Sequence, residues 1–160
     1  MTSLRAVSIM CDDEYDDEYG TCAQTYASLC IYPGEIDPTE VTERLGVEPS
    51  SWQRQGELQQ RADRRPRAAT LNGWFLTSKG CIDSRDSRRH IDWILDQIEP
   101  SAEALRSLQR EGCRTEVSCF WISQSGHGGP TIPPSQMRRL ADLSLELWFD
   151  FYGPHDEDDA

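Results

Sequence analysis

The chain has 160 residues, of which 37% are hydrophobic and 28% are charged, and its formal net charge at pH 7 is -12. A single core of this size buries about two thirds of the surface of the unfolded chain, so the length favours one domain. The negative charge disfavours non-specific binding to nucleic acid, because neutralising phosphates requires a cationic surface.

The acidic residues are concentrated at the two ends of the chain. Six lie between Asp12 and Glu18, and four more lie between Asp156 and Asp159. Blocks of like charge at chain ends are usually solvated, so we expect disordered acidic tails at 1–21 and 154–160 around one α+β domain at 22–153. The alternatives are that a tail folds over the basic part of the chain, or that it mimics an anionic polymer in the cationic site of a partner.

The first strand and the first helix have clear local signals. Residues that favour strands run from Thr25 to Tyr32 and stop at a Pro-Gly pair, which predicts a strand. Asp37 can cap the following helix, Pro38 suits its first position, and Gly46 suits the left-handed residue that ends a helix.

Residues 47–69 show little hydrophobic periodicity and predict a long loop, with a short extended piece around Trp52. A second strand is predicted from Trp74 to Ser78, between two glycines. From Arg54 to Arg89 the chain has nine Lys or Arg against four acidic residues, and this is its only basic stretch.

A long amphipathic helix is predicted to begin after Asp86 or Ser87, since apolar residues recur every three or four positions from Ile91 to Leu108. Pro100 interrupts this pattern, so we expect a kink or a second short helix there. The third strand is predicted at Thr115–Gln124.

The last part of the domain predicts a glycine-rich loop at 126–130, a helix at Ser135–Leu143 and a strand at Leu145–Tyr152. Apolar residues alternate with other residues along that strand, which is typical of a sheet with one partly solvated face. The order of elements predicts an α+β fold with a single mixed or antiparallel sheet of about four strands and helices packed on one face, in a ferredoxin-like arrangement.

The six cysteines contain no CxxC pair, and no histidine is placed to complete a zinc site, so we expect no metal or other cofactor. The sequence contains no signal-like apolar stretch and no run of about 20 apolar residues. We therefore expect a cytoplasmic protein with reduced thiols and no membrane partner.

Two groups of residues could carry chemistry. His127 lies in the glycine-rich loop, where backbone N–H groups can converge on an anion, although a connection that needs positive φ explains the glycines equally well. Asp150 and Glu146 share one face of the last strand with Trp148 and Tyr152. If that face lies beside the His127 loop, a ligand-binding or acid–base pocket results, and otherwise these residues form a solvated rim.

Other polar residues have simpler interpretations. His90 and Asp92 are two residues apart on a predicted helix and therefore cannot form a dyad with each other. We expect His90 to pack or to cap the helix. Cys30 and Cys119 lie in predicted strands, where a buried thiol behaves as a small hydrophobic residue.

Several blocks, among them YASLCIY, DPTEVTERLGVEP, GWFLTS, SCFWISQSGHGGP and LELWFDFYG, resemble a bacterial family described as domain of unknown function 4279, over roughly Thr25 to Gly153. The resemblance implies a fold and marked positions but no reaction. The positions that match the family's pattern are Trp52, Gly56, Trp74, Ser78, His90, Trp121, His127, Gly128, Gly129, Pro130, Trp148, Asp150 and Tyr152. Those expected to contact a ligand or partner are Trp52, Trp74, His90, His127, Gly128, Gly129, Trp148, Asp150 and Tyr152.

The leading hypothesis is a non-catalytic protein-binding module with an inhibitory or immunity-like role, because Trp, Tyr and Arg are enriched at interface hot spots and no catalytic set is evident. The alternative is a small-ligand sensor or an enzyme that uses His127 with Asp150 on an anionic ligand. A third hypothesis, nucleic-acid binding through Arg54–Arg89, is disfavoured by the overall charge.

Overall fold

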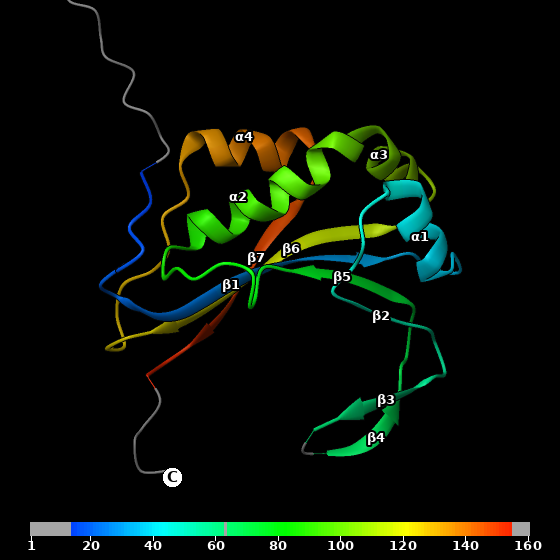
Figure 1. The fold of residues 1–160 in the computed structure, drawn as a ribbon, viewed down its shortest axis with the longest axis horizontal. Helices are drawn as coiled ribbons and strands as arrows, with labels where there is room; N and C mark the ends of the chain where they lie inside the picture. The colour runs from blue at the N-terminus through cyan, green and yellow to red at the C-terminus, as the bar shows by residue number, and fades with distance from the viewer. Residues whose placement is uncertain (1–13, 63, 155–160) are drawn as a thin grey trace, which may run out of the picture.

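A five-stranded mixed sheet organises the molecule (Figure 1). The computed structural model describes residues 14–62 and 64–154. The strands are β1 (Cys22–Tyr32), β2 (Ser51–Gln53), β3 (Leu58–Arg61), β4 (Arg64–Ala68), β5 (Gly73–Thr77), β6 (Arg114–Ser123) and β7 (Glu146–Tyr152). The sheet has the order β2-β5-β1-β6-β7, in which all neighbours are antiparallel except β6 and β7, which are parallel.

The helices are α1 (Pro38–Leu45), α2 (Ser87–Ile98), α3 (Ala102–Arg110) and α4 (Pro134–Asp142). The predicted caps of α1 are confirmed, since Asp37 accepts a hydrogen bond from the Thr39 N–H and Gly46 is left-handed with φ 66°. The predicted interruption at Pro100 is also confirmed. A 3-10 turn at Glu99–Ser101 separates α2 from α3, because proline lacks the N–H that a continuous helix needs there.

The hydrophobic core lies between the helices and one face of the sheet. Alternation along β1 directs Ala27, Leu29 and Ile31 toward the helices, and all three are completely buried. The apolar residues of α2 and α3, such as Ile94 and Leu105, pack against them. The four helices lie on this one face (Figure 1), as predicted from the sequence.

The sheet is larger than predicted, and the ferredoxin-like arrangement is not confirmed. The extended piece around Trp52 is a fifth strand, β2, which pairs with β5. A ferredoxin-like fold has the element order β-α-β-β-α-β, so its second and third strands follow each other without an intervening helix. Here helices separate the four main strands of the five-stranded sheet along the chain. In sequence, α1 comes between β1 and β5, α2 and α3 come between β5 and β6, and α4 comes between β6 and β7.

The predicted long loop at 47–69 contains the whole of a second, separate sheet. Strands β3 and β4 pair only with each other, and the hairpin that they form projects away from the five-stranded sheet (Figure 1). This hairpin, residues 58–68, is called the arm below. Its polar sequence has no apolar alternation, so the pattern gave no strand signal. In the part of the chain that the structure describes, no helix has the length and apolar composition to cross a membrane.

Candidate functional site

The face of the sheet opposite the helices, called the open face, carries a row of aromatic side chains. Tyr26 stacks on Phe120 with ring centroids 4.6 Å apart, and the ring of Tyr152 lies 5.2 Å from that of Phe120. Trp148 is 41% exposed and Tyr152 is 47% exposed. No described helix covers this face (Figure 1), so the row forms a partly solvated aromatic surface.

Charged groups surround the aromatic row. The Lys79 ammonium lies 5.1 Å from the ring centroid of Tyr26, and the Trp148 indole N–H donates to Glu116 at 3.2 Å. The Tyr152 hydroxyl donates to Asp150 at 3.2 Å, and this hydrogen bond raises the pKa of Tyr152. The aromatic side chains are therefore held in position by neighbours rather than left free on the surface.

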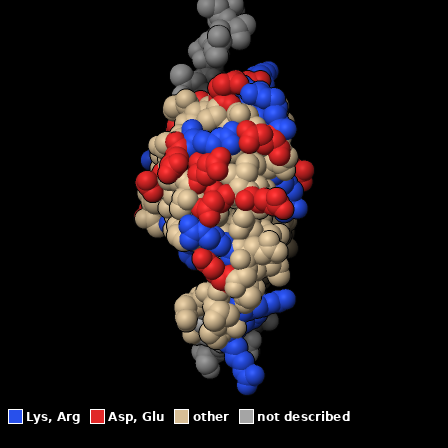
Figure 2. Space-filling view, turned by 90° about the vertical axis from the view of Figure 1, so that its right-hand side faces the viewer, with Lys and Arg blue, Asp and Glu red and all other residues tan. Residues whose placement is uncertain are grey.

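The arm is a cationic projection. Its base is fixed by a backbone hydrogen bond of 2.8 Å from the Gly56 N–H to the Ala69 carbonyl. Arg64, Arg65 and Arg67 are exposed, and none of them has an ion pair with another residue that the structure describes. The space-filling view shows basic side chains extending from the arm, whereas basic and acidic groups alternate on the body of the molecule (Figure 2).

Arg54 fixes the root of the arm to the rest of the molecule. Its guanidinium lies 4.5 Å over the ring of Trp52, and its Nε donates to Asp37 at 2.7 Å. This hydrogen bond holds the pKa of Asp37 well below its ordinary value. Asp37 also caps α1, so a single carboxylate joins the start of that helix to the root of the arm.

A cleft of about 460 Å³ lies where the arm meets the sheet. It is lined by Gln53 of β2, Gln59 and Gln60 of β3, and Arg67 of β4, together with the small residues at 68–70. Amide and guanidinium groups suit a polar or acidic segment of a partner better than an apolar ligand.

The glycine-rich loop does not bring His127 to a carboxylate. The His127 ring is exposed, and its Nδ1 lies 3.1 Å from the Ser125 hydroxyl. Among the described residues, no hydrogen bond or ion pair joins His127 to an acidic side chain, and Asp150 is instead bonded to Tyr152. The segment that precedes β1 contacts the glycine-rich loop. The Tyr19 hydroxyl donates to the Gly129 carbonyl at 2.7 Å, and Thr21 occupies the space beside Gly128.

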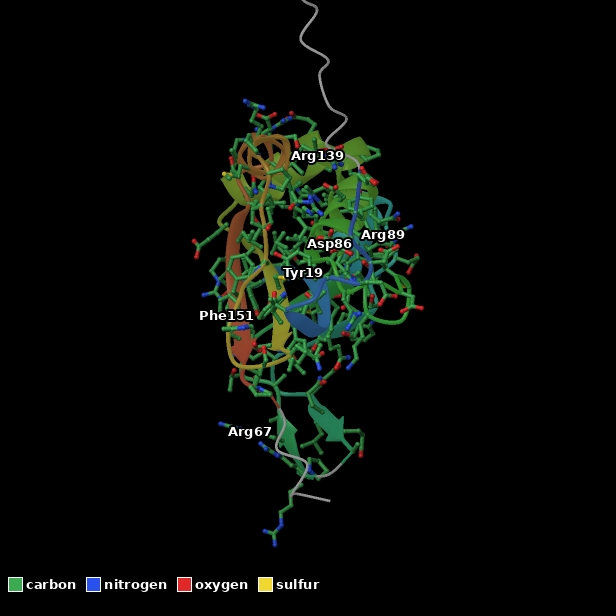
Figure 3. All side chains as sticks on the ribbon, turned by 90° about the vertical axis from the view of Figure 1, so that its left-hand side faces the viewer. Tyr19, Arg67, Asp86, Arg89, Arg139 and Phe151 are labelled. Atoms are coloured by element: carbon green, nitrogen blue, oxygen red, sulfur yellow. The ribbon has the colours of Figure 1, made fainter. Side chains whose placement is uncertain are left out.

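Residues 14–21 pack against the start of α2 (Figure 3). Arg89 pairs with Asp17 at 2.7 Å, and Arg85 pairs with Glu18 at 2.8 Å. The Asp16 N–H donates to the buried carboxylate of Asp86 at 2.8 Å. Residues 14–21, which were expected to belong to the N-terminal tail, therefore contact the domain through ion pairs and a buried hydrogen bond near the start of α2. Residues 1–13 and 155–160 of the expected tails lie outside the described residues.

Asp86 is the most deeply buried carboxylate in this contact. Burial raises its pKa, but hydrogen bonds from the Arg88 guanidinium and from the N–H groups of Asp16 and Arg88 more than offset that effect, and the net pKa is lowered. Asp86 therefore remains charged and caps α2.

Trp74 and His90, both expected to contact a ligand or partner, are buried. The Trp74 indole N–H donates to Thr42 at 2.9 Å, and His90 bonds to Ser78 and to the Ser84 carbonyl. A hollow of about 190 Å³ beside His90 is smaller than the roughly 300 Å³ at which small-molecule sites begin. In the described part of the chain, no three His, Cys, Asp or Glu side chains converge to hold a metal.

Of the nine predicted contact residues, Trp148, Asp150 and Tyr152 lie together on the open face, Trp52 lies at the root of the arm, and His127, Gly128 and Gly129 form the separate loop. The aromatic partners Tyr26 and Phe120 were not predicted. Their signal was present, because alternation around the apolar Ala27 and Leu29 places Tyr26 on the opposite face of β1.

Residues 23–154 match the family described as Domain of unknown function (DUF4279). Comparisons with curated proteins and with solved structures gave no match.

Proposed function

Since the chain belongs to the DUF4279 family, whose description assigns no activity, we propose from the geometry of its surface that it is a non-catalytic protein-binding module. The open face and the arm together engage an acidic surface of a partner protein. By covering that surface the chain acts as an inhibitor or immunity-like protein.

The observation that supports the proposal most is that the arm projects on the side of the sheet opposite the helices (Figure 1), which is the side that carries the aromatic row. Trp148 and Tyr152 offer large, partly exposed rings of the kind that dominate interface energetics. Arg64, Arg65 and Arg67 offer guanidinium groups that form two-pronged hydrogen bonds with carboxylates.

A protein partner fits these features better than a reaction or a nucleic acid. Acid–base chemistry by His127 with Asp150 would need the imidazole and the carboxylate to share a proton, and the contacts of the described residues do not join them. A nucleic acid is a long polyanion and would extend beyond the arm over the rest of the molecule. The net charge of the chain, -12, would repel it there.

The test is affinity capture from the native host with mass spectrometry, followed by binding measurements on the partner identified. The binding variant carries Arg64→Glu, Arg65→Glu and Arg67→Glu. Its control carries Arg106→Glu, Arg110→Glu and Arg138→Glu, which change the charge equally on the helical side. We expect the partner to bind the wild type and the control but not the arm variant.

A second variant, Trp148→Ala with Tyr152→Ala, tests the open face separately, and we expect it to lose at least tenfold in affinity. Capture of no partner above background would contradict the proposal. So would a partner that binds every variant equally, or one whose capture is abolished by nuclease.

A further inference from the structure

Strand β7 is an edge of the five-stranded sheet, and no other described strand pairs with its outer side. It lies at the end of the strand order, so one row of its backbone N–H and C=O groups has no partner in the sheet. Figure 3 shows β7 along the flank of the molecule, with Phe151 on it. Phe151 is 56% exposed, although it lies on the side of the sheet that carries the helices.

Natural proteins usually block such edges with lysine, proline, bulges or very short strands. Strand β7 has none of these features: its seven residues, ELWFDFY, contain no basic residue and no proline, and they pair with β6 in one continuous register. The opposite edge is different, since β2 has only three residues and then leads into Arg54 and the arm. Only one of the two edges is therefore suited to further strand pairing.

From these features we propose that β7 pairs antiparallel with β7 of a second copy of this chain, about a two-fold axis that passes beside Phe149. The two sheets then join into one sheet of ten strands. The axis is perpendicular to the sheet, so the side chains that face the helices in one copy meet those that face the helices in the other.

The side chains of β7 select this register. With Phe149 opposite its symmetry mate, Leu147 lies opposite Phe151, Glu146 opposite Tyr152, and Asp150 opposite Trp148. Each carboxylate then lies opposite an aromatic side chain rather than opposite another carboxylate. No like charges face one another across the pair.

Moving the two-fold axis by one residue in either direction also keeps the helix-facing sides of the two sheets together. Both of these registers are unfavourable. With Trp148 at the axis, Glu146 lies opposite Asp150. With Asp150 at the axis, that carboxylate lies opposite its own symmetry mate. Like charges directly opposite each other destabilise a sheet, so of these three registers only the one centred on Phe149 avoids this repulsion.

The pairing of β7 between two copies does not depend on the proposed function, but a dimer would change how the chain binds a partner. Because the axis is perpendicular to the sheet, both open faces and both arms point to the same side of the dimer. Two binding surfaces presented together can engage a repetitive or dimeric partner with greater avidity than one.

Sedimentation velocity of the full chain over a concentration series tests the pairing. We expect a reversible dimer that strengthens with added salt, because salt screens the repulsion between two chains of charge -12. Binding of an acidic partner through the arm would instead weaken with salt, so the two proposals can fail separately. Phe151→Lys is expected to give a monomer, and Leu58→Lys, an equal change at an exposed residue of the arm, is expected to leave the dimer intact.

Cysteine cross-linking tests the register, in a background carrying Cys11→Ser and Cys81→Ser. Phe149→Cys should form an intermolecular disulfide on mild oxidation, because directly opposite Cα atoms lie about 5 Å apart. Phe151→Cys should not, because the two copies of residue 151 are about 13 Å apart in this register. If Phe149→Cys does not fold, a Glu146→Cys and Tyr152→Cys double variant places cysteines opposite each other at exposed positions.

Three results would overturn the proposal: a monomer at every concentration, a dimer that Phe151→Lys does not weaken, or equal cross-linking at positions 149 and 151.

Discussion

The Ser78 hydroxyl lies 2.8 Å from Nδ1 of His90 and 3.2 Å from the Ala27 carbonyl, and both Ser78 and His90 are almost completely buried. The direction of the hydrogen bond between Ser78 and His90 follows from the other ring nitrogen. His90 Nε2 lies 2.9 Å from the Ser84 carbonyl, which can only accept, so Nε2 carries the proton and Nδ1 is free to accept. The neutral ring thus joins α2 to two points of the loop between β5 and α2, at Ser78 and at Ser84.

Replacing this ring should change the pH dependence of stability. Burial lowers the pKa of His90 below its ordinary value, although the hydrogen bond to Ser84 opposes the shift. As the pH falls below about 6.5, the unfolded chain therefore binds a proton before the native state does, and the free energy of unfolding decreases. His90→Gln lacks this contribution, so its stability should decline less between about pH 7 and pH 5.

Urea unfolding at a series of pH values measures this difference. At neutral pH His90→Gln should also be less stable than the wild type by about 2 kcal/mol, because Ser78 and Ser84 lose a buried partner. His127→Gln is the control, since it makes the same substitution at an exposed ring. Parallel stability curves for the wild type and His90→Gln would contradict the assignment.

The N-terminal segment should contribute to stability through residues 14–21. Deleting residues 1–21 removes the Asp16 N–H from Asp86 and leaves Arg85 and Arg89 without their carboxylate partners. We expect this deletion to lower the free energy of unfolding by roughly 2 kcal/mol, most of it from the buried hydrogen bond rather than the exposed ion pairs. Deletion of residues 1–13 keeps these contacts and should have a much smaller effect in the same unfolding measurement.

Local signals were sufficient to predict α1 and the break at Pro100, because capping residues and proline act within one helical turn. They were insufficient for the arm, since β3 and β4 are held by backbone pairing and carry no apolar alternation. Contacts between residues that are distant in sequence also could not be predicted from local patterns. Ser78 and His90 both match the family's pattern, but the sequence does not show that they are in contact. Their hydrogen bond is evident only once α2 is packed on the sheet.

The glycine-rich loop offers a matched pair of substitutions. Gly128 has φ 84°, and a Cβ at that position would clash with the Thr21 side chain, whereas a Cβ on Gly129 would meet nothing within 4 Å. Gly128→Ala should therefore destabilise the protein by about 2 kcal/mol or more, from backbone strain and from displacement of the segment before β1. Gly129→Ala should remain close to the wild type in thermal unfolding. Equal melting temperatures for the two variants would show that Thr21 does not restrict the loop.

The strand thiols should be inert in the native protein. Burial raises the pKa of Cys119 to about 12 and that of Cys30 to about 11, so neither is a thiolate at neutral pH. In a Cys11→Ser background, a thiol-specific reagent should react quickly with the exposed Cys81 and with the remaining cysteines only after unfolding. Fast reaction of two or more thiols in the native protein would instead favour a nucleophilic role for one of them.

The arm should be dispensable for stability. Its strands pair only with each other, and Arg64, Arg65 and Arg67 are exposed, so replacing all three with Glu removes no described contact with the core. We expect the free energy of unfolding to change by less than about 0.5 kcal/mol, while the affinity for an acidic partner is lost. By contrast, Arg54→Ala should lower stability, because it removes the hydrogen bonds to Asp37 at the root of the arm. If the triple variant unfolds as readily as Arg54→Ala, the arm is part of the folded core, and loss of binding could not be assigned to its charge.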